Sequence, residues 1–305
     1  MKILVTGGAG FIGSHLVDKL IEKGHKVIVI DDLSTGKREN LNEKARFYKI
    51  DVCDLKISKI FGREKPEIIF HMAAQINVRK SIEEPMKDAM INILGSLNLL
   101  ENSKKFNIKK FIFASTGGAI YGEVDIFPTP ESYPELPISP YGICKLAIEK
   151  YLNYYYKVFG LPFVSLRFAN VYGPRQNPKG EAGVIAIFCD KMLSGKQPVI
   201  HGDGRQIRDF TYVEDIVKAS ILAMEKNKTG IFNIGTAKEN NINTVFKRIK
   251  KLTNSDCEEI HGSAQPGEQR KSCLNYSKAE RELGWHPKYS LEKGLGMTVD
   301  WFKMH

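Results

Sequence analysis

Short apolar runs alternate along the chain with longer stretches in which apolar residues recur at helical spacing. The short runs have the pattern of buried strands and span residues 2–6, 26–30, 46–51, 67–73, 109–115 and 163–169. The helical stretches span residues 11–24, 85–106 and 140–160. This alternation predicts an α/β protein with a doubly wound parallel sheet. Ligands of such sheets bind outside the carboxyl ends of the strands, so the residues after each run are the first candidates for a site.

The first strand-to-helix connection is rich in glycine. Gly7, Gly10 and Gly13 form a Gly-x-x-Gly-x-x-Gly pattern, and Asp31 ends the next strand 18 residues after Gly13. Glycine lets the backbone approach a pyrophosphate, and the helix N-terminus offers free N–H groups. A carboxylate at Asp31 can accept hydrogen bonds from a ribose 2′-OH and would repel the 2′-phosphate of NADP. The pattern predicts a Rossmann-type domain that binds NAD; the alternative is a tight turn without a ligand.

Composition narrows the class of protein. The chain has 305 residues and a formal net charge of +10, but its lysines are scattered and form no basic stripe. We therefore expect a small anionic partner and no nucleic acid. Five scattered cysteines and seven histidines lack Cys-x-x-Cys and His-x-x-x-His pairs, which favours neither disulfides nor a metal site. Without a signal peptide or a membrane-length apolar run, we expect a cytoplasmic protein with no membrane partner.

The segment SPYGICK places Tyr141 and Lys145 four positions apart. On a helix, two side chains at this spacing share a face. A free phenol has a pKa of about 10, too high for a base at neutral pH, and a nearby ammonium group favours the phenolate. The pair could therefore supply a poised acid–base group. The same spacing also occurs in ordinary helix turns, so it does not decide between these readings by itself.

Seven motifs occur in the order typical of one family: TGGAGFIG, HMAAQ, STGGAIYG, SPYGICK, NVYGPRQ, RDFTYVEDI and NIG. Over almost its whole length the chain resembles the extended short-chain dehydrogenases/reductases, and among them it is most similar to nucleotide-sugar 4-epimerases of the UDP-glucose/UDP-galactose type. The resemblance implies that Tyr141 is the catalytic acid/base. It implies that Lys145 lowers the pKa of this tyrosine and binds the nicotinamide ribose. It also implies a hydroxyl partner at Thr116, with Ser115 as a near rival.

The expected NAD site follows the ends of the predicted strands. Ala73 and Ala74 suit a close approach by the cofactor, although tight packing explains small residues equally well. Asn92 lies inside a predicted helix, where its amide either faces solvent or clamps a neighbouring loop. The expected cofactor contacts are Gly7, Gly10, Phe11, Ile12, Gly13, Asp31, Asp32, Leu33, Ser34, Thr35, Gly36, Asp51, Val52, Met72, Ala73, Ala74, Gln75, Asn92, Ser115, Tyr141, Lys145 and Ala169.

Beyond Asn170 the pattern loosens into a less regular lobe that we expect to hold the nucleotide sugar. The resemblance implies substrate contacts from Asn170, Val184 and Arg208, in addition to Thr116 and Tyr141. A buried diphosphate needs fixed donors, and arginine presents a planar fork of them. For Arg208, the alternative is a structural salt bridge with Asp209 or Asp215.

The chain departs from the family pattern in the segment QPGEQRKS. Gln265 stands where the family often has a diphosphate-binding arginine, and Glu268 replaces the usual aspartate. Arg270 could supply the missing charge. Ser272 matches the position that limits the pocket beside the sugar, and a small residue there would leave room for an N-acetyl group. We therefore expect activity on UDP-N-acetylhexosamines as well as on UDP-hexoses.

The expected reaction is NAD-dependent 4-epimerisation through a transient 4-keto sugar, with NAD regenerated in each cycle. The loop TGGAIYG has no acidic residue before Glu123, whereas related dehydratases and decarboxylases carry one there. This favours oxidation and reduction at a single carbon. The alternatives are another NAD-dependent nucleotide-sugar dehydrogenase or reductase, which would show net redox turnover, and a non-catalytic NAD-sensing protein.

We expect two domains and a homodimer. The NAD-binding domain should comprise residues 1–168 plus about 209–234, and the nucleotide-sugar lobe about 169–208 plus 235–305. The helix at 140–160 is apolar on most of its circumference, and such a helix is usually buried on all sides. Two such helices from each chain could pair around a two-fold axis. The resemblance implies the same assembly.

Overall fold

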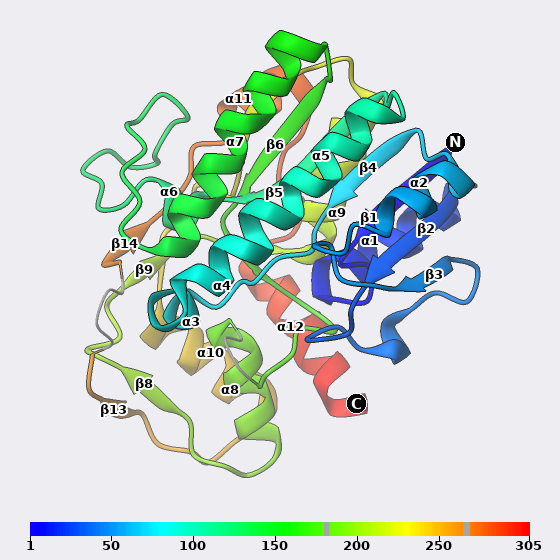
Figure 1. Cartoon of the computed structure of the whole chain (residues 1–305). Coiled ribbons are helices and arrows are strands. Elements are labelled where there is room, and N and C mark those ends of the chain that lie inside the picture. Colours follow the sequence, from blue (N-terminus) through cyan, green and yellow to red (C-terminus); the bar gives the residue numbers. More distant parts are fainter. Residues whose placement is uncertain (180–182, 265–268) are drawn as a thin grey trace.

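The computed structural model describes residues 1–179, 183–264 and 269–305. Its centre is a seven-stranded sheet in the order β11-β6-β5-β4-β1-β2-β3, in which every neighbouring pair of strands is parallel (Figure 1). The strand order reverses between β1 and β4, which confirms the predicted doubly wound sheet. The strands are β1 (Lys2–Thr6), β2 (Lys26–Asp31), β3 (Arg46–Lys49), β4 (Ile68–His71), β5 (Lys110–Thr116), β6 (Phe163–Phe168) and β11 (Gly230–Ile234).

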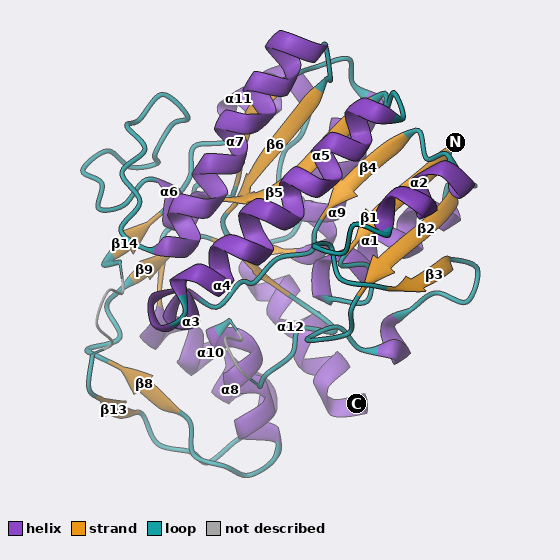
Figure 2. Cartoon of the chain, in the orientation of Figure 1, coloured by secondary structure: helices purple, strands orange, loops and turns teal. Residues whose placement is uncertain are grey.

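Alternate residues of the strands divide between two hydrophobic cores, one on each face of the sheet. On β1, Ile3 and Val5 belong to one core and Leu4 to the other, as the two-residue period of a strand requires. Figure 2 shows helices on both sides of the strands. The first core is closed by α1 (Phe11–Glu22), α9 (Val213–Glu225) and α11 (Ser277–Leu283). The second is closed by α2 (Ile57–Glu64), α5 (Gly95–Lys105) and α7 (Pro140–Phe159).

Helix α7 begins and ends where the sequence predicts. The Ser139 hydroxyl oxygen accepts the N–H of Gly142 at 3.2 Å, and Pro140 occupies the first turn. Gly160 follows the helix with a φ of 70°, a conformation that favours glycine and ends a helix. Among the described residues, no helix combines the length and the apolarity needed to cross a membrane.

The predicted helix at 85–106 contains one wider turn. It consists of α4 (Pro85–Ala89), a π-helical turn labelled η2 (Met90–Leu94) and α5. The wider turn contains Asn92, whose side chain is buried. Isolated π turns within α-helices frequently occur at functional sites. The shorter helices near the site are η1 (Arg38–Asn40), α3 (Val78–Glu83) and α6 (Gly117–Ile120).

A third hydrophobic core lies outside the main sheet and is built largely by α8 (Val184–Leu193), α10 (Ile242–Thr253) and α12 (Leu291–Met304). Short strand pairs surround it. These strands are β7 (Asn170–Tyr172) with β10 (Phe210–Tyr212), β8 (Val199–His201) with β13 (Ile260–Gly262), and β9 (Ile207–Arg208) with β12 (Asn240–Asn241) and β14 (Lys271–Ser272). Of these elements, β7, α8, β8, β9, β10, α10 and β14 contribute residues to the cleft described below.

Asp209 ties this region to the edge of the main sheet. Its carboxylate is fully buried and accepts the N–H and the hydroxyl of Thr236 at 2.8 and 2.6 Å. It also accepts the N–H groups of Ala237 at 3.1 Å and Leu274 at 3.3 Å. Burial raises the pKa of Asp209, and these hydrogen bonds oppose the rise. One carboxylate therefore joins three segments that are distant in the sequence.

Replacing Asp209 with alanine should destabilise the protein strongly, because several buried donors lose their acceptor together. We expect the free energy of unfolding to fall by about 3 kcal/mol, measured by urea denaturation. The matched control is Asp203→Ala. Asp203 pairs with Arg270 at the surface, so its loss should lower the free energy of unfolding far less. Equal unfolding midpoints for the two variants would contradict this account.

Candidate active site

Two positions of the turn between β1 and α1 require glycine. Gly7 has a φ of 69°, and a Cβ atom there would lie 2.6 Å from the backbone nitrogen of Ala73. A Cβ atom at Gly13 would lie 2.0 Å from the carbonyl oxygen of Gly7. Gly10 is the N-cap of α1 and has no side chain that could accept the first N–H groups of the helix. The first turn of α1 also contains no acidic residue. The N-terminus of α1 can therefore bind an anionic group through its backbone N–H groups.

Asp31 fixes a carboxylate beside this turn. Its two oxygens accept the N–H groups of Ala9 and Leu33, each at 2.9 Å. Burial raises the pKa of Asp31, while these two hydrogen bonds lower it. Gly36 lies against the carboxylate of Asp31: a Cβ atom at Gly36 would be 2.9 Å from Oδ1 of Asp31. Each carboxylate oxygen can accept a second hydrogen bond, which fits the predicted contact with a ribose.

The other residues predicted for the cofactor gather at the same edge of the sheet, because parallel strands all end there. Phe11 and Ile12 begin α1. The loops after the strands carry Asp32, Leu33, Ser34, Thr35 and Gly36 after β2, Asp51 and Val52 after β3, Met72, Ala73, Ala74 and Gln75 after β4, and Ala169 after β6. The turn, the fixed carboxylate and these loops together fit a dinucleotide.

Asn92 clamps the loop that follows β4. Its Oδ1 accepts the N–H of Gln75 at 3.0 Å, and its Nδ2 donates to the carbonyl oxygen of Gln75 at 2.9 Å. The buried carboxylate of Asp88 accepts hydrogen bonds from Asn92 at 2.9 Å and from the Gln75 side chain at 2.8 Å. Of the two alternatives that the sequence leaves open for Asn92, the structure supports the clamp.

Lys145 is the buried cation of the site. Its side chain is 4% exposed, and its Nζ donates to the carbonyl oxygen of Ala114 at 2.9 Å. The same Nζ lies 4.7 Å from the ring centre of Phe113 and 5.8 Å from that of Tyr141. Burial lowers the pKa of Lys145 to about 8, while the carboxylate of Asp88 opposes the shift. The structure thus gives the tyrosine a close cationic neighbour, which favours a phenolate.

Thr116 and Ser115 occupy different environments at the end of β5. The Ser115 side chain is buried, and its hydroxyl has no hydrogen-bond partner within the described part of the chain. Thr116 is half-buried and lines a cleft that also receives Tyr141. Neighbouring residues of a strand point to opposite faces. Thr116 therefore has the position from which a hydroxyl can reach a ligand beside Tyr141.

The cleft has a volume of about 890 Å³. Its described lining includes the cationic side chains of Arg79, Lys191 and Arg208 and contains no carboxylate. Such a lining favours an anionic ligand. The predicted substrate residues that line it are Thr116, Tyr141, Asn170, Val184, Arg208 and Ser272.

Arg208 enters the cleft from β9. Its Nη1 donates to the carbonyl oxygen of Ile207 at 2.9 Å. The two carboxylates that the sequence offers as alternative partners accept main-chain N–H groups: Asp209 from Thr236 at 2.8 Å and Asp215 from Lys288 at 3.0 Å. The position of Arg208 in the lining fits the predicted contact with a phosphate.

One predicted substrate residue within the described chain, Arg270, does not line the cleft. Arg270 donates two hydrogen bonds of 2.8 Å to the carboxylate of Asp203 and is absent from the described lining. Gln265 and Glu268 lie outside the described residues. Arg79, which the sequence did not single out, is a cation that lines the described cleft.

Sequence reasoning also missed the buried His71, which lies behind the cofactor loops. One ring nitrogen, Nδ1, is 2.8 Å from the Thr6 hydroxyl, and Nε2 is 2.8 Å from the Ser96 hydroxyl. Burial lowers the pKa of His71 to about 3, and the charge of Lys145 adds to the shift. The imidazole is therefore neutral and serves as a hydrogen-bonding link between β1, β4 and α5. Its sequence signal was a polar residue ending the apolar run IIFH.

Comparison with known proteins matches residues 3–235 to the NAD dependent epimerase/dehydratase family. The chain is 48% identical over 301 residues to a protein of Methanocaldococcus jannaschii, covering 99% of this chain and 98% of that one. The crystal structure of a UDP-glucose 4-epimerase with UDP-glucose from Thermotoga maritima is 54% identical, with a TM-score of 0.99 and coverage of 100% and 99%.

A UDP-N-acetylglucosamine 4-epimerase from Methanobrevibacter ruminantium, solved with UDP-N-acetylmuramic acid, is 40% identical, with a TM-score of 0.94 and coverage of 99% and 97%. The matched region includes the glycine turn, Asp31, Tyr141, Lys145 and Arg208, whose geometry is described above. On these grounds the chain belongs to the NAD dependent epimerase/dehydratase family.

Proposed function

We propose that this protein interconverts the C4 epimers of a UDP-hexose, with UDP-glucose and UDP-galactose as the first pair. The observation that carries the proposal is that Tyr141 and Thr116 line one cleft, while the buried ammonium of Lys145 lies 5.8 Å from the centre of the Tyr141 ring. The cleft adjoins the edge of the sheet where the dinucleotide features lie. Its cationic lining suits a nucleoside diphosphate.

NAD is the cofactor that the family uses, and the turn from Gly7 to Gly13, Asp31 and the loop held by Asn92 would bind it. When bound, NAD supplies the hydride chemistry, oxidising C4 of the sugar to a 4-keto group and reducing it again. The chain's own contribution is to orient both molecules and to move one proton. Ser115 and Lys145 complete the predicted contacts of the cofactor near Tyr141.

Tyr141 takes the proton from the 4-hydroxyl of the sugar and returns it after the sugar has turned over. Lys145 makes this possible because its positive charge favours the phenolate. With a pKa of about 8, Lys145 is mostly charged at neutral pH. Thr116 donates a hydrogen bond to the reacting oxygen and keeps it within reach of the phenol. The described lining offers no carboxylate for a second proton transfer at a neighbouring carbon, which favours epimerisation over dehydration.

The nucleotide end of the substrate lies in the smaller lobe, which we assign to about residues 169–208 and 235–305. Asn170 and Arg208 hold the diphosphate while the sugar is free to rotate, and Val184 contacts the nucleotide beside them. Gln265 and Glu268 remain predicted contacts. A net dehydrogenase or reductase is the alternative function, and it differs by consuming a nicotinamide cofactor stoichiometrically.

Incubating the purified protein with UDP-glucose should produce UDP-galactose, and the reverse, without added reductant or oxidant. A panel of UDP-, GDP- and dTDP-sugars, with the epimers separated by chromatography, measures this directly. We expect turnover of UDP-hexoses with no accumulation of NADH, because the hydride returns to the same carbon.

The matched variant for this assay is Tyr141→Phe, which keeps the ring and removes the acid–base group. We expect kcat to fall by about a thousandfold with the protein still folded, the scale of general acid–base catalysis. Full activity of Tyr141→Phe would exclude the proposed role of the phenol. Stoichiometric NADH formation by the wild-type protein would favour the dehydrogenase alternative.

The small side chain of Ser272 leaves space in the part of the cleft that would hold the sugar. It is buried on β14, lines the cleft, and lies 3.8 Å from where a Cβ atom of Gly118 would stand, in the turn that follows Thr116. The UDP-N-acetylglucosamine 4-epimerase with a similar structure supports the same substrate class. We therefore propose that UDP-N-acetylhexosamines are also substrates.

Ser272→Tyr should lower kcat/KM for UDP-N-acetylglucosamine by at least about tenfold while affecting UDP-glucose much less, because the larger ring would occupy the space of the acetyl group. Ser272→Ala is the control and should process both sugars. The substrate proposal fails if the wild-type protein shows no turnover of the acetylated sugar.

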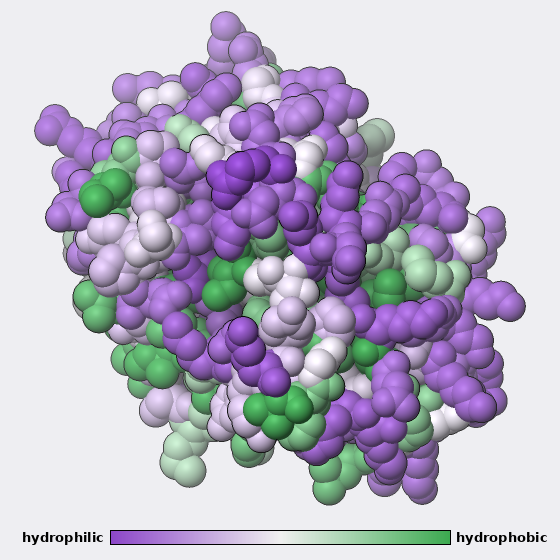
Figure 3. Space-filling view, turned by 90° about the horizontal axis from the view of Figure 1, so that it is seen from above, coloured by the Kyte–Doolittle hydropathy of each residue, from purple (hydrophilic) through white to green (hydrophobic). Residues whose placement is uncertain are grey.

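We also propose that the active form is a homodimer. In the described structure α7 packs beside α4, η2 and α5, as Figure 1 shows. Figure 3 shows that the surface seen from above is mainly hydrophilic, interrupted by hydrophobic groups. On the paired helices large apolar side chains stay exposed at helical spacing: Ile143, Tyr151, Tyr154 and Val158 on α7, and Met86, Met90 and Leu94 along α4 and η2. A second copy would bury these residues in a four-helix contact.

Gel filtration and sedimentation should therefore give twice the 34.4 kDa mass of the chain at micromolar concentration. Changing Leu94 and Tyr154 together to aspartate should yield monomers, because charges cannot be buried at the contact. Met304→Asp, at an exposed site on α12, is the control. A monomeric wild-type protein would overturn the assignment.

A further inference from the structure

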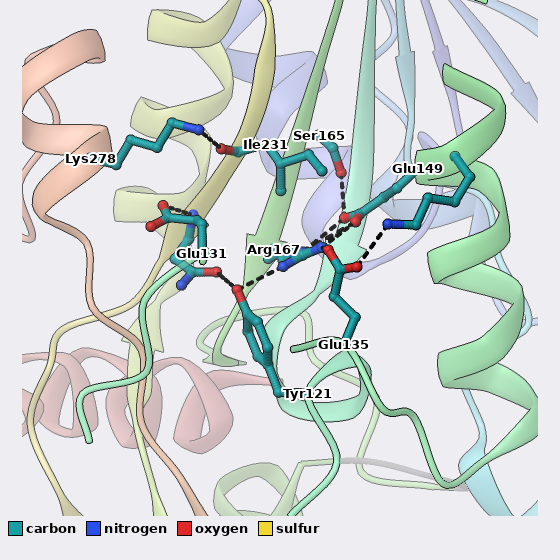
Figure 4. Close-up of polar contacts among 10 residues, drawn as sticks. Tyr121, Glu131, Glu135, Glu149, Ser165, Arg167, Ile231 and Lys278 are labelled. Atoms are coloured by element: carbon teal, nitrogen blue, oxygen red, sulfur yellow. Dashed lines mark hydrogen bonds and ion pairs between the residues drawn. The ribbon is translucent and has the colours of Figure 1, made fainter. Parts of the chain in front are cut away.

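Arg167 is a fully buried charged side chain near the carboxyl end of β6. A buried guanidinium is costly unless charged or polar partners surround it. Figure 4 shows these partners, which come from several different segments of the chain. None of them was assigned a role in the reaction described above.

The first partner is Glu149 of helix α7. Arg167 donates from Nε to both carboxylate oxygens of Glu149, at 3.1 and 3.2 Å, and from Nη2 to Oε2 at 2.5 Å. The Ser165 hydroxyl adds a hydrogen bond of 2.8 Å to the same carboxylate. Glu149 follows Lys145 by one helical turn and Tyr141 by two, so the three side chains project from similar positions around α7. The guanidinium therefore anchors the helix that carries both residues.

The second partner is Tyr121, which directly follows α6. Nη1 of Arg167 donates to the Tyr121 oxygen at 2.8 Å, and the phenol donates to Oδ1 of Asn233 at 2.8 Å. The guanidinium carbon also lies 4.9 Å from the centre of the Tyr121 ring. Thr116 is the N-cap of α6, so this contact fixes the far end of the turn that begins at Thr116.

The third partner is Glu135, in the segment that leads into α7. Nη2 of Arg167 donates to one of its oxygens at 2.6 Å, and Lys150 of α7 donates to the other at 2.7 Å. Two cations and two carboxylates thus alternate across the junction of β6, α7 and the preceding segment. The guanidinium of Arg167 is at the centre of this arrangement (Figure 4).

We propose that Arg167 is a positioning residue for the epimerisation, acting through Glu149 and Tyr121. One rigid fork holds the helix with Tyr141 and Lys145 and, at the same time, the turn that starts at Thr116. Small displacements between such groups cost large factors in rate, because the reacting atoms must be aligned. The inference rests on the proposed function, since it takes Tyr141 as the proton-transferring group.

The arrangement also affects the charge felt by the Tyr–Lys pair. Asp88 of α4 and Glu149 of α7 favour the charged form of Lys145. Burial raises the pKa of the neighbouring Cys144 thiol to about 12, so this group carries no charge at neutral pH. The nearby imidazole of His71 on β4 is neutral as well. Arg167 offsets the charge of Glu149, and Lys150 offsets that of Glu135. Removing the positive charge of Arg167 should therefore favour protonated groups at the site, and removing the negative charge of Glu149 should favour deprotonated ones.

The test compares Arg167→Gln and Glu149→Gln with the wild-type protein by two readouts. One is the pH dependence of kcat for UDP-glucose, and the other is an ultraviolet difference titration of the Tyr141 phenolate, using Tyr141→Phe as the blank. We expect the acid limb and the phenolate pKa to rise by about one unit in Arg167→Gln and to fall by about one unit in Glu149→Gln. A role limited to packing would not give shifts of opposite sign.

Tyr121→Phe keeps the ring and removes only the hydroxyl that Arg167 contacts, so it remains informative if Arg167→Gln does not fold. We expect kcat to fall about tenfold while KM for UDP-glucose stays within about twofold. The matched control is Lys110→Met, which removes a buried cation from the opposite end of β5, where Nζ donates to the carbonyl oxygens of Ala223 and Lys226. It should lower Tm and leave kcat and the pH profile unchanged.

Variants of Arg167, Glu149 and Tyr121 that behave like Lys110→Met, with lower Tm but wild-type kcat and pH profile, would overturn the proposal. This result is distinct from failure of the proposed function, in which the wild-type protein itself would not interconvert UDP-sugars. In that case the phenolate titration still reports whether Arg167 and Glu149 set the charge state of Tyr141, and opposite shifts would support this electrostatic link while the role in epimerisation falls with the proposed function.

Discussion

The site is organised around the ammonium group of Lys145, which is almost completely buried between helix α7 and strand β5. Its hydrogen bond to the carbonyl oxygen of Ala114 and its position near the Tyr141 ring fix where a positive charge stands in the molecule. Burial lowers the pKa of Lys145, and the negative charge of Asp88 opposes this shift. The acid–base chemistry that we propose for the phenol depends on this balance, because only a charged lysine favours the phenolate.

A charge buried this deeply requires the surrounding helices, strands and loops to keep fixed positions relative to one another. On the cofactor side, Asn92 and Asp88 hold the loop after β4. On the opposite side, Arg167 joins α7 to the turn after Thr116 through Glu149 and Tyr121. The groups that line the cleft near Tyr141 and Thr116 are therefore attached to rigid elements, as the proposed reaction requires.

The fold and much of the site follow from local patterns. The apolar runs give the parallel sheet, the positive φ of Gly7 and the crowding at Gly13 explain the glycine turn, and Asp31 ends its strand as expected. The features that the sequence could not show depend on contacts between residues that are far apart in the chain. Helix propensity, for example, does not predict the wider turn at Asn92.

Long-range partners account for the remaining differences. Arg167 reads as a charged residue in an apolar run, because its partners Glu135, Glu149 and Tyr121 come together only after folding. Similarly, Arg270 pairs with Asp203 across the surface. The most direct test of the whole account is a crystal structure of the protein with NAD and a UDP-hexose. It should place Oη of Tyr141 within about 2.6–3.2 Å of the oxygen on C4 of the sugar; a bound sugar whose C4 oxygen contacts another acid–base group, with Tyr141 out of reach, would contradict the account.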